Sequence, residues 1–178
     1  MPETKTEGKQ QQQLTEEEIE EIEKEEETEE LEKRDEREIE KEIMGETMLD
    51  YFYQFSLRGK TVTGISIAGL REIARKMGNI KVSEPKIEDK KDRWICKTEV
   101  KDLLRNVTAW GISQQLKKMK LREGESEDEF ALQKCYSKSL RNALRSLIPE
   151  RLISHMLQKF IAEAKRQSNI PKVETKIL

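Results

Sequence analysis

A row of four cationic side chains carries the clearest chemical signal in the sequence. Lys134, Lys138, Arg141 and Arg145 follow one another at intervals of four, three and four residues. In a helix these intervals place all four on one side, because residues three and four apart are neighbours on the helix surface. No acidic residue interrupts the row, although like charges at this spacing repel each other. The row therefore predicts a surface that follows the phosphates of a nucleic acid.

Further cations and one aromatic residue are candidates for the same surface. Two pairs of cations lie on a predicted helix and on the polar side of a predicted strand: Arg71 with Arg75, and Lys97 with Lys101. Trp110 precedes a glycine and could stack on a base, which is worth about 1–3 kcal/mol per base in single-strand binders. Burial in the core is nevertheless the first expectation for Trp110 and for Trp94, because large aromatic side chains mostly pack inside.

The residue types that most catalytic and metal sites need are scarce. His155 is the only histidine, which excludes a multi-histidine zinc site, and Cys96 and Cys135 lie far apart with no partner motif. The Gly-Lys-Thr at 59–61 is similar to the end of a phosphate-binding P-loop, but Gln54 stands where that motif requires a glycine. We therefore expect a protein that is not an enzyme and that needs no cofactor and no metal.

Hydropathy and cysteine usage bear on location. The mean hydropathy is −0.87 and no long apolar run occurs, so we expect no transmembrane helix and no membrane partner. The N-terminus is polar and rich in Gln and Glu, unlike a signal peptide. Two unpaired cysteines are typical of a reduced compartment. These features predict an intracellular protein, in the cytoplasm of a prokaryotic host.

Periodicity places the candidate residues on an α+β domain. The apolar period is 3.6 in the helical segments and changes to 2 between residues 79 and 112, which predicts a three-stranded antiparallel meander with its first strand interrupted at Pro85. The predicted order is a strand at 51–57 with a short return at 61–63, a helix at 66–77, the meander at 79–112, a charged loop or hairpin extension at 114–128, and two C-terminal helices at about 127–147 and from 149 onward.

The charge of the chain is divided between two parts. The formal net charge is −2, but residues 1–48 carry −13 and residues 49–178 carry +11. We expect residues 1–48 to form an acidic Glu-rich arm, disordered or a solvated helix, in preference to a dedicated coiled coil. Residues 49–166 form the basic domain, and residues 167–178 a flexible tail. The arm is either a solubility tail or an acidic mimic of DNA that competes in cis for the cation row.

Two groups of segments resemble recombination proteins of phages and archaeal viruses. The first group is Tyr-Gln-Phe at 53–55, Gly-Lys-Thr-Val-Thr-Gly at 59–64 and Ser-Ile-Ala-Gly-Leu at 66–70; the second is Lys-Ser-Leu-Arg-Asn-Ala-Leu-Arg at 138–145 with Leu-Ile-Pro at 147–149. The order of helix, meander and long basic helix also resembles the core of single-strand annealing proteins of the RecT, Redβ and ERF kind. The resemblance covers about residues 51–160.

The resemblance implies a site and a way of working. Such proteins bind single-stranded DNA along a positively charged groove and anneal complementary strands, commonly as rings or filaments. By motif position, DNA contacts would fall to Lys138, Arg141 and Arg145, and to Lys60. The acidic arm departs from the usual pattern of the family.

These observations lead to one expected function and one alternative. We expect a non-catalytic protein that binds single-stranded DNA through its phosphates and promotes annealing in recombination or replication, with RNA as an open alternative ligand. We expect the protein to form a homo-oligomer and to bind a replication or nuclease partner protein. The alternative is a protein–protein adaptor in a viral or plasmid replication complex. Recognition of duplex DNA would need a helix-turn-helix, for which no suitable two-helix unit is visible.

Overall fold

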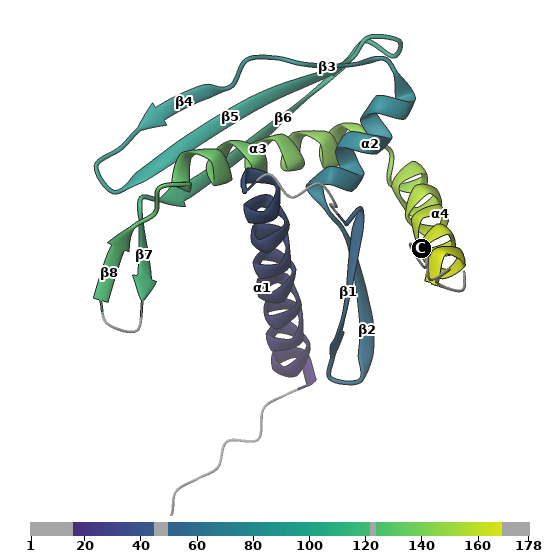
Figure 1. The fold of residues 1–178 in the computed structure, drawn as a ribbon, viewed down its shortest axis with the longest axis horizontal. Helices are drawn as coiled ribbons and strands as arrows, with labels where there is room; N and C mark the ends of the chain where they lie inside the picture. Colours follow the sequence, from purple (N-terminus) through teal and green to yellow (C-terminus); the bar gives the residue numbers. More distant parts are fainter. Residues whose placement is uncertain (1–15, 45–49, 122–123, 169–178) are drawn as a thin grey trace, which may run out of the picture.

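The computed structural model describes residues 16–44, 50–121 and 124–168, and its fold is α+β, as the sequence predicts (Figure 1). The elements in chain order are α1 (Glu16–Ile43), β1 (Phe52–Leu57), β2 (Lys60–Ile65), α2 (Ile67–Met77), β3 (Ile80–Val82), β4 (Lys86–Asp89), β5 (Arg93–Asp102), β6 (Val107–Leu116), β7 (Lys118–Leu121), β8 (Gly124–Glu127), α3 (Ala131–Leu147) and α4 (Glu150–Ser168).

The central sheet is antiparallel and has β5 in its middle. Strand β6 pairs along the whole of β5, from Arg93 opposite Leu116 to Asp102 opposite Val107. The other edge of β5 is shared by β3 and β4, each antiparallel to it. The break between these two short strands contains Pro85, which has no backbone N–H to donate to a ladder. The sheet is therefore a meander whose first row is interrupted.

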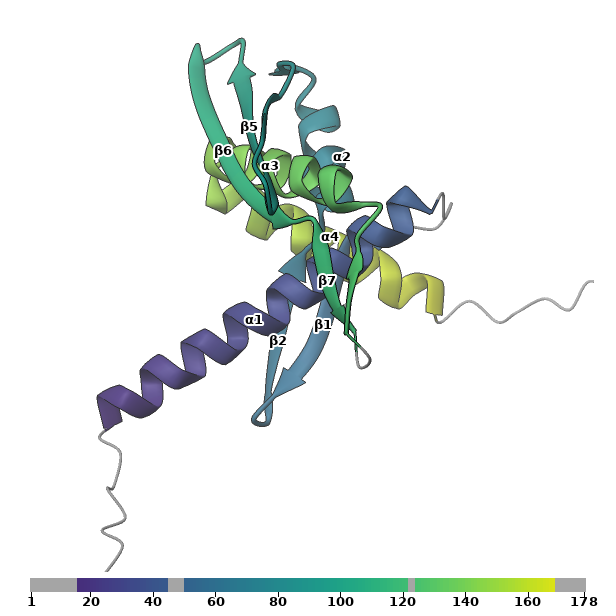
Figure 2. The same cartoon turned by 90° about the vertical axis from the view of Figure 1, so that its left-hand side faces the viewer.

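Helix α3 packs along one face of this sheet (Figures 1 and 2). Gly111 on β6 allows the close approach, because a Cβ at this position would lie 1.9 Å from the carbonyl oxygen of Ser139. The hydroxyl of Ser139 also lies 2.6 Å from that of Thr98 on β5. Successive side chains of a strand point to opposite faces, so Cys96 and Val100 on β5 point to the same face as Thr98, toward α3, and both are fully buried.

The remaining helices complete the core on the other sides of α3. Leu140, Leu144 and Leu147 of α3 belong to one buried cluster with residues of α2 and α4. Helix α2 has regular ends: the hydroxyl of Ser66 accepts a hydrogen bond from the backbone N–H of Gly69, and the C-terminal residue Gly78 is left-handed, with φ of 70°. These local signals explain why its bounds match the predicted helix at 66–77.

The β1–β2 hairpin and α1 lie side by side on the side of α3 away from the sheet (Figures 1 and 2). Arg58 in the hairpin turn pairs with Glu26 of α1 at 2.7 Å. The predicted connector at 114–128 is the end of β6 followed by a second hairpin, β7–β8.

The acidic arm differs from the solvated or disordered segment that we expect from its sequence. Its described part is helical over Glu16–Ile43, and the last turns of α1 pack on the domain: Ile39 is fully buried in the core, and Asp35 and Glu38 are buried as well. A sparse apolar stripe suffices here because carboxylates of α1 also meet cations of α3. Helix α4 continues to Ser168, and residues 1–15 of the arm and 169–178 of the predicted tail lie outside the described residues.

Candidate nucleic-acid interface

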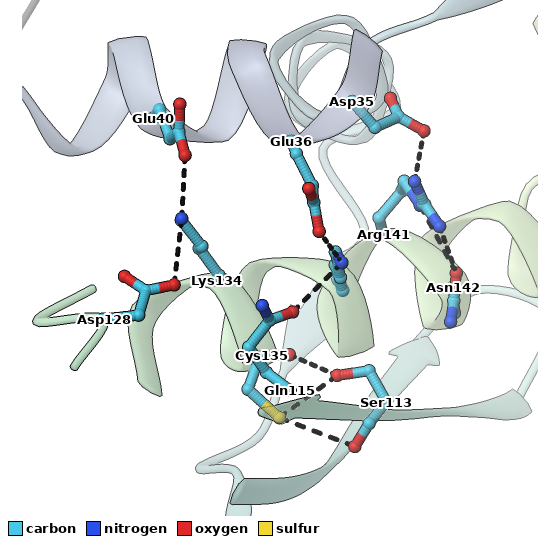
Figure 3. A network of polar contacts seen from close by, with 11 residues as sticks. Asp35, Glu36, Glu40, Ser113, Gln115, Asp128, Lys134, Cys135, Arg141 and Asn142 are labelled. Atoms are coloured by element: carbon cyan, nitrogen blue, oxygen red, sulfur yellow. Dashed lines mark hydrogen bonds and ion pairs between the residues drawn. The ribbon is translucent and has the colours of Figure 1, made fainter. Parts of the chain in front are cut away.

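The first three members of the cation row on α3, Lys134, Lys138 and Arg141, face α1 instead of solvent (Figure 3). Lys134 is buried and lies between two carboxylates, at 2.7 Å from Glu40 of α1 and at 3.0 Å from Asp128. The pKa of Lys134 is raised: burial alone would lower it, but these two carboxylates stabilise the charged ammonium more strongly. The expectation that the row is open for phosphates is therefore wrong for its first member.

The next two members of the row are paired in the same way. Lys138 forms an ion pair with Glu36 of α1 and donates a hydrogen bond to the side chain of Gln115 at 3.1 Å. Arg141 forms an ion pair with Asp35 of α1, and its side chain is only 15 % exposed. Helical geometry places the cations on one face as predicted, but no pattern in the sequence indicates that α1 covers that face.

Burial changes the pKa of the Asp35 carboxylate. Burial raises its pKa above the usual range, and the Arg141 guanidinium beside it opposes that rise. The pKa of the neighbouring Tyr53 hydroxyl is raised too, first by burial and then by the negative charge of Asp35. One oxygen of Asp35 and one of Glu38 are buried without a hydrogen-bond partner among the described residues. The acidic helix is thus held at a cost in desolvation.

The other predicted cations of the helices do not join into one surface. Arg145, the last of the row, is exposed. Arg71 forms an ion pair with Glu42 of α1. Arg75 pairs with Glu72 on its own helix at 2.7 Å, and this hydrogen bond lowers the pKa of Glu72 to about 2. Lys60 starts β2 at the tip of a hairpin that points away from the sheet (Figure 1).

The face of the sheet away from α3 is open and carries the remaining predicted residues. Lys97, Lys101 and Trp110 all point to this outer face, as the period-2 pattern and the pairing register require. Trp110 is 43 % exposed, so the expectation of a core position for it is wrong. The reason is its neighbour Gly111, which occupies the inward position against α3 and so turns Trp110 outward.

The ammonium groups of two lysines from neighbouring strands lie over the Trp110 ring. The ammonium of Lys97 lies 4.5 Å from the ring centroid, and that of Lys86 on β4 lies 5.9 Å from it. Lys86 is opposite Lys97, and Lys81 on β3 is opposite Lys101. The sequence analysis does not include Lys81 and Lys86, which share the outer face with Lys97 and Lys101. Their alternation with the apolar residues Ile80, Val82 and Ile87 is the signal that could have placed them on this polar face.

This outer face carries both lysine side chains and exposed apolar side chains. In the part of the chain that the structure describes, no ion pair with a carboxylate is found for Lys81, Lys86, Lys97 or Lys101. The face also has exposed apolar side chains on β6: Ile112 is 59 % and Leu116 is 53 % exposed. Its acidic members lie on β5 and β4: Glu99 and Glu88.

A hollow of about 700 Å³ lies where the outer face meets the cation row. Its lining includes Arg93, Gln114 and Leu116 from the end of the outer face, and Lys134 with Glu40 from the α1–α3 contact. The carboxylates of Glu36 and Asp128 line the hollow as well, so it joins the end of the outer face to the ion pairs between α1 and α3. Among the described residues, no three His, Cys, Asp or Glu side chains gather as a metal site.

Comparison with known proteins identifies a relative of part of the chain. No protein-family model matches the chain. The chain is 31 % identical over 121 residues to the uncharacterized protein MJ0352 of Methanocaldococcus jannaschii, a match that covers 68 % of this chain and 47 % of that protein. The chain thus spans about half the length of this relative. No helix in the described ranges has the length and apolar character needed to cross a bilayer.

Proposed function

We propose that this protein binds single-stranded nucleic acid on the outer face of its sheet and acts as a non-catalytic annealing protein in recombination or replication. The observation that carries the proposal is the exposed indole of Trp110 on an open antiparallel sheet, with the ammonium groups of Lys97 and Lys86 lying over its ring at 4.5 and 5.9 Å. Aromatic side chains that stack on bases, combined with cations that follow the backbone, are what single-strand binding requires.

The dimensions of the face suit a strand of nucleic acid. The pair Lys86 and Lys97 and the pair Lys81 and Lys101 are four residues apart along β5, a distance of about 13 Å at the rise of a β-strand. Phosphates running along β5 could contact both pairs while a base stacks on Trp110 between them. Because none of these contacts reads the edge of a base, the binding would discriminate little among sequences.

The annealing role rests on the resemblance to single-strand annealing proteins. The chain order of α2, the strands β3–β6 and, after the β7–β8 hairpin, the basic helix α3 supports this part of the proposal. DNA is the proposed natural ligand, with RNA to be compared directly in the same assays. Oligomers are expected, since annealing proteins of this kind commonly work as rings or filaments.

A single-tryptophan variant tests the proposed surface directly. In Trp94→Phe, Trp110 is the sole tryptophan, and titration with an oligothymidylate should quench its fluorescence as a base stacks on it. Trp110→Ala should weaken binding about five- to 150-fold, which corresponds to the loss of 1–3 kcal/mol of stacking. Leu104→Ala, which removes another exposed apolar side chain at the β5–β6 turn, is the matched control and should bind normally. Equal affinities for the two alanine variants would refute the stacking surface.

A second candidate function is a protein–protein adaptor, and a specific observation favours it. Ile112 and Leu116 expose large apolar side chains on the same face, and exposed apolar patches are typical of protein interfaces. Under this alternative, the purified protein would not retard an oligonucleotide at physiological salt. Instead, Ile112→Ser would abolish co-purification with a partner protein.

A further inference from the structure

The contact between α1 and α3 is mostly ionic and small in apolar area. In the described part of α1, only Ile39 and Ile43 belong to the core cluster or pack against it. The rest of the contact consists of three carboxylates that meet three cations in antiparallel order: Asp35 with Arg141, Glu36 with Lys138, and Glu40 with Lys134 (Figure 3). The carboxylates of Glu36 and Glu40 are 37 % and 48 % exposed, so another anion can reach these two pairs and exchange with them.

The three cations would form a regular row if α1 moved away. Positions 134, 138 and 141 lie about 6 and 4.5 Å apart along the axis of α3. Within the described chain, the partners left to them would be Asp128 for Lys134, and the neutral amides of Gln115 and Asn142 for Lys138 and Arg141. The exposed Arg145 would continue the row by another turn. The carboxylates of α1 therefore occupy positions that backbone phosphates could take.

We propose that the row Lys134–Lys138–Arg141 is a second binding site for nucleic-acid phosphates, which the carboxylates of α1 occupy in the free protein. This inference rests on the proposed function, because a strand bound along the outer face reaches the row through the hollow at the end of β6. The arm is then an exchangeable cover: bound nucleic acid displaces the C-terminal half of α1. Nucleic acid and the arm compete for the same cations, and the protein binds weakly until a strand is long enough to reach both surfaces.

Neutral replacements on α1 test the proposal without deleting the helix. Glu36→Gln with Glu40→Gln removes two of the three pairs but keeps Ile39 and the helix-forming character of the segment. The affinity for a labelled oligothymidylate should rise about tenfold, the scale expected for releasing two partly exposed ion pairs. The dependence of log affinity on log salt should steepen by about 0.7 for each cation that now binds a phosphate without first losing a carboxylate of α1.

A matched control separates the cover from overall charge. Glu25→Gln with Glu32→Gln removes the same two charges at exposed positions of the same helix. If both double variants gain equally, the effect is one of net charge and the proposal is overturned. Adding Lys138→Gln to the Glu36→Gln and Glu40→Gln variant should return the affinity to that of the wild-type protein.

The outcomes also distinguish this inference from the proposed function. Binding by wild-type protein that is lost in Trp110→Ala, with no gain in Glu36→Gln and Glu40→Gln, keeps the outer face and overturns the covered row. Binding that appears only in the Glu36→Gln and Glu40→Gln variant keeps the row and overturns the outer face. Hydrogen exchange gives an independent check on wild-type protein: amides of residues 34–44 should exchange faster when the oligonucleotide is added, and unchanged exchange would overturn displacement of α1.

Discussion

Replacing Lys86 and Lys97 by glutamine should reduce the salt dependence of binding by a calculable amount. The four lysines of the outer face, Lys81, Lys86, Lys97 and Lys101, account for a slope of about −2.8 in log affinity against log salt, at about 0.7 per phosphate contact on a single strand. The double variant keeps two of them and should have a slope of about −1.4. Each lost phosphate contact lowers log affinity by about 0.7 for every tenfold reduction in salt concentration below 1 M. At 0.1 M salt the loss of two contacts therefore corresponds to about 25-fold weaker binding than that of the wild-type protein.

The fold should tolerate this double variant. Lys86 and Lys97 are exposed, and both contact the ring of Trp110. A cation–π contact at an exposed site is worth about 0.5–1 kcal/mol, so the midpoint of urea unfolding should move little. Circular dichroism and urea titration of the variant confirm that any loss of binding has its origin in the surface.

Fluorescence polarisation with a labelled oligothymidylate, repeated between about 50 and 200 mM salt, measures the slope. The matched control is Arg151→Gln with Lys159→Gln, which removes the same charge from two exposed positions of α4. The control should keep the wild-type slope. If the slope of Lys86→Gln with Lys97→Gln equals that of the control, phosphates do not follow the outer face, and the reasoning from its geometry fails.

Three further predictions test the fold around the site. Gly111→Ala should destabilise the protein by about 1–3 kcal/mol in urea unfolding, because its Cβ would overlap the backbone of α3. Cys96 and Cys135 should not react with a thiol reagent until the protein unfolds, since both are buried and burial raises the pKa of Cys96 to about 12; rapid labelling of native protein would contradict this packing. Asp102→Asn should lower Tm at neutral pH. Hydrogen bonds to the Asp102 carboxylate, above all from the backbone N–H of Arg105, hold its pKa below the ordinary value of about 3.9. The folded state therefore favours the charged form of Asp102, and the substitution removes that stabilisation. This difference in Tm should shrink as pH falls below about 4, and a constant difference would argue against a charged Asp102.

Local patterns in the sequence predict the strands and helices that carry the outer face. The alternation in 93–102 correctly separates Cys96 and Thr98, which face α3, from Lys97, which faces outward. The serine and glycine around residues 67–77 mark the ends of α2. These features depend on near neighbours in the chain, so a single sequence contains them.

Contacts between distant segments decide what the sequence could not predict. The core position expected for Trp110 follows from the average behaviour of tryptophan, whereas its real position follows from the fit of Gly111 against Ser139 of α3. The row on α3 was correctly placed on one helix face, yet its partner Glu36 is 102 residues away from Lys138 in the chain. Neither helical periodicity nor net charge indicates which of many glutamates in a 28-residue helix meets which lysine.

The energetics of buried ion pairs favour exchange over permanent closure. An apolar contact of similar size between α1 and α3 would hold the helix at least as firmly, because desolvation cancels much of the attraction within a buried pair. Asp35 illustrates the cost, since it is buried, has a raised pKa and leaves one oxygen without a partner among the described residues. Ionic contacts differ from an apolar contact in one respect: after α1 moves away, the exposed face of α3 is charged and can bind phosphate. Under this proposal, three carboxylates of the −13 arm and three cations of the +11 remainder form one site, which α1 neutralises in the free state and nucleic acid would neutralise in the bound state.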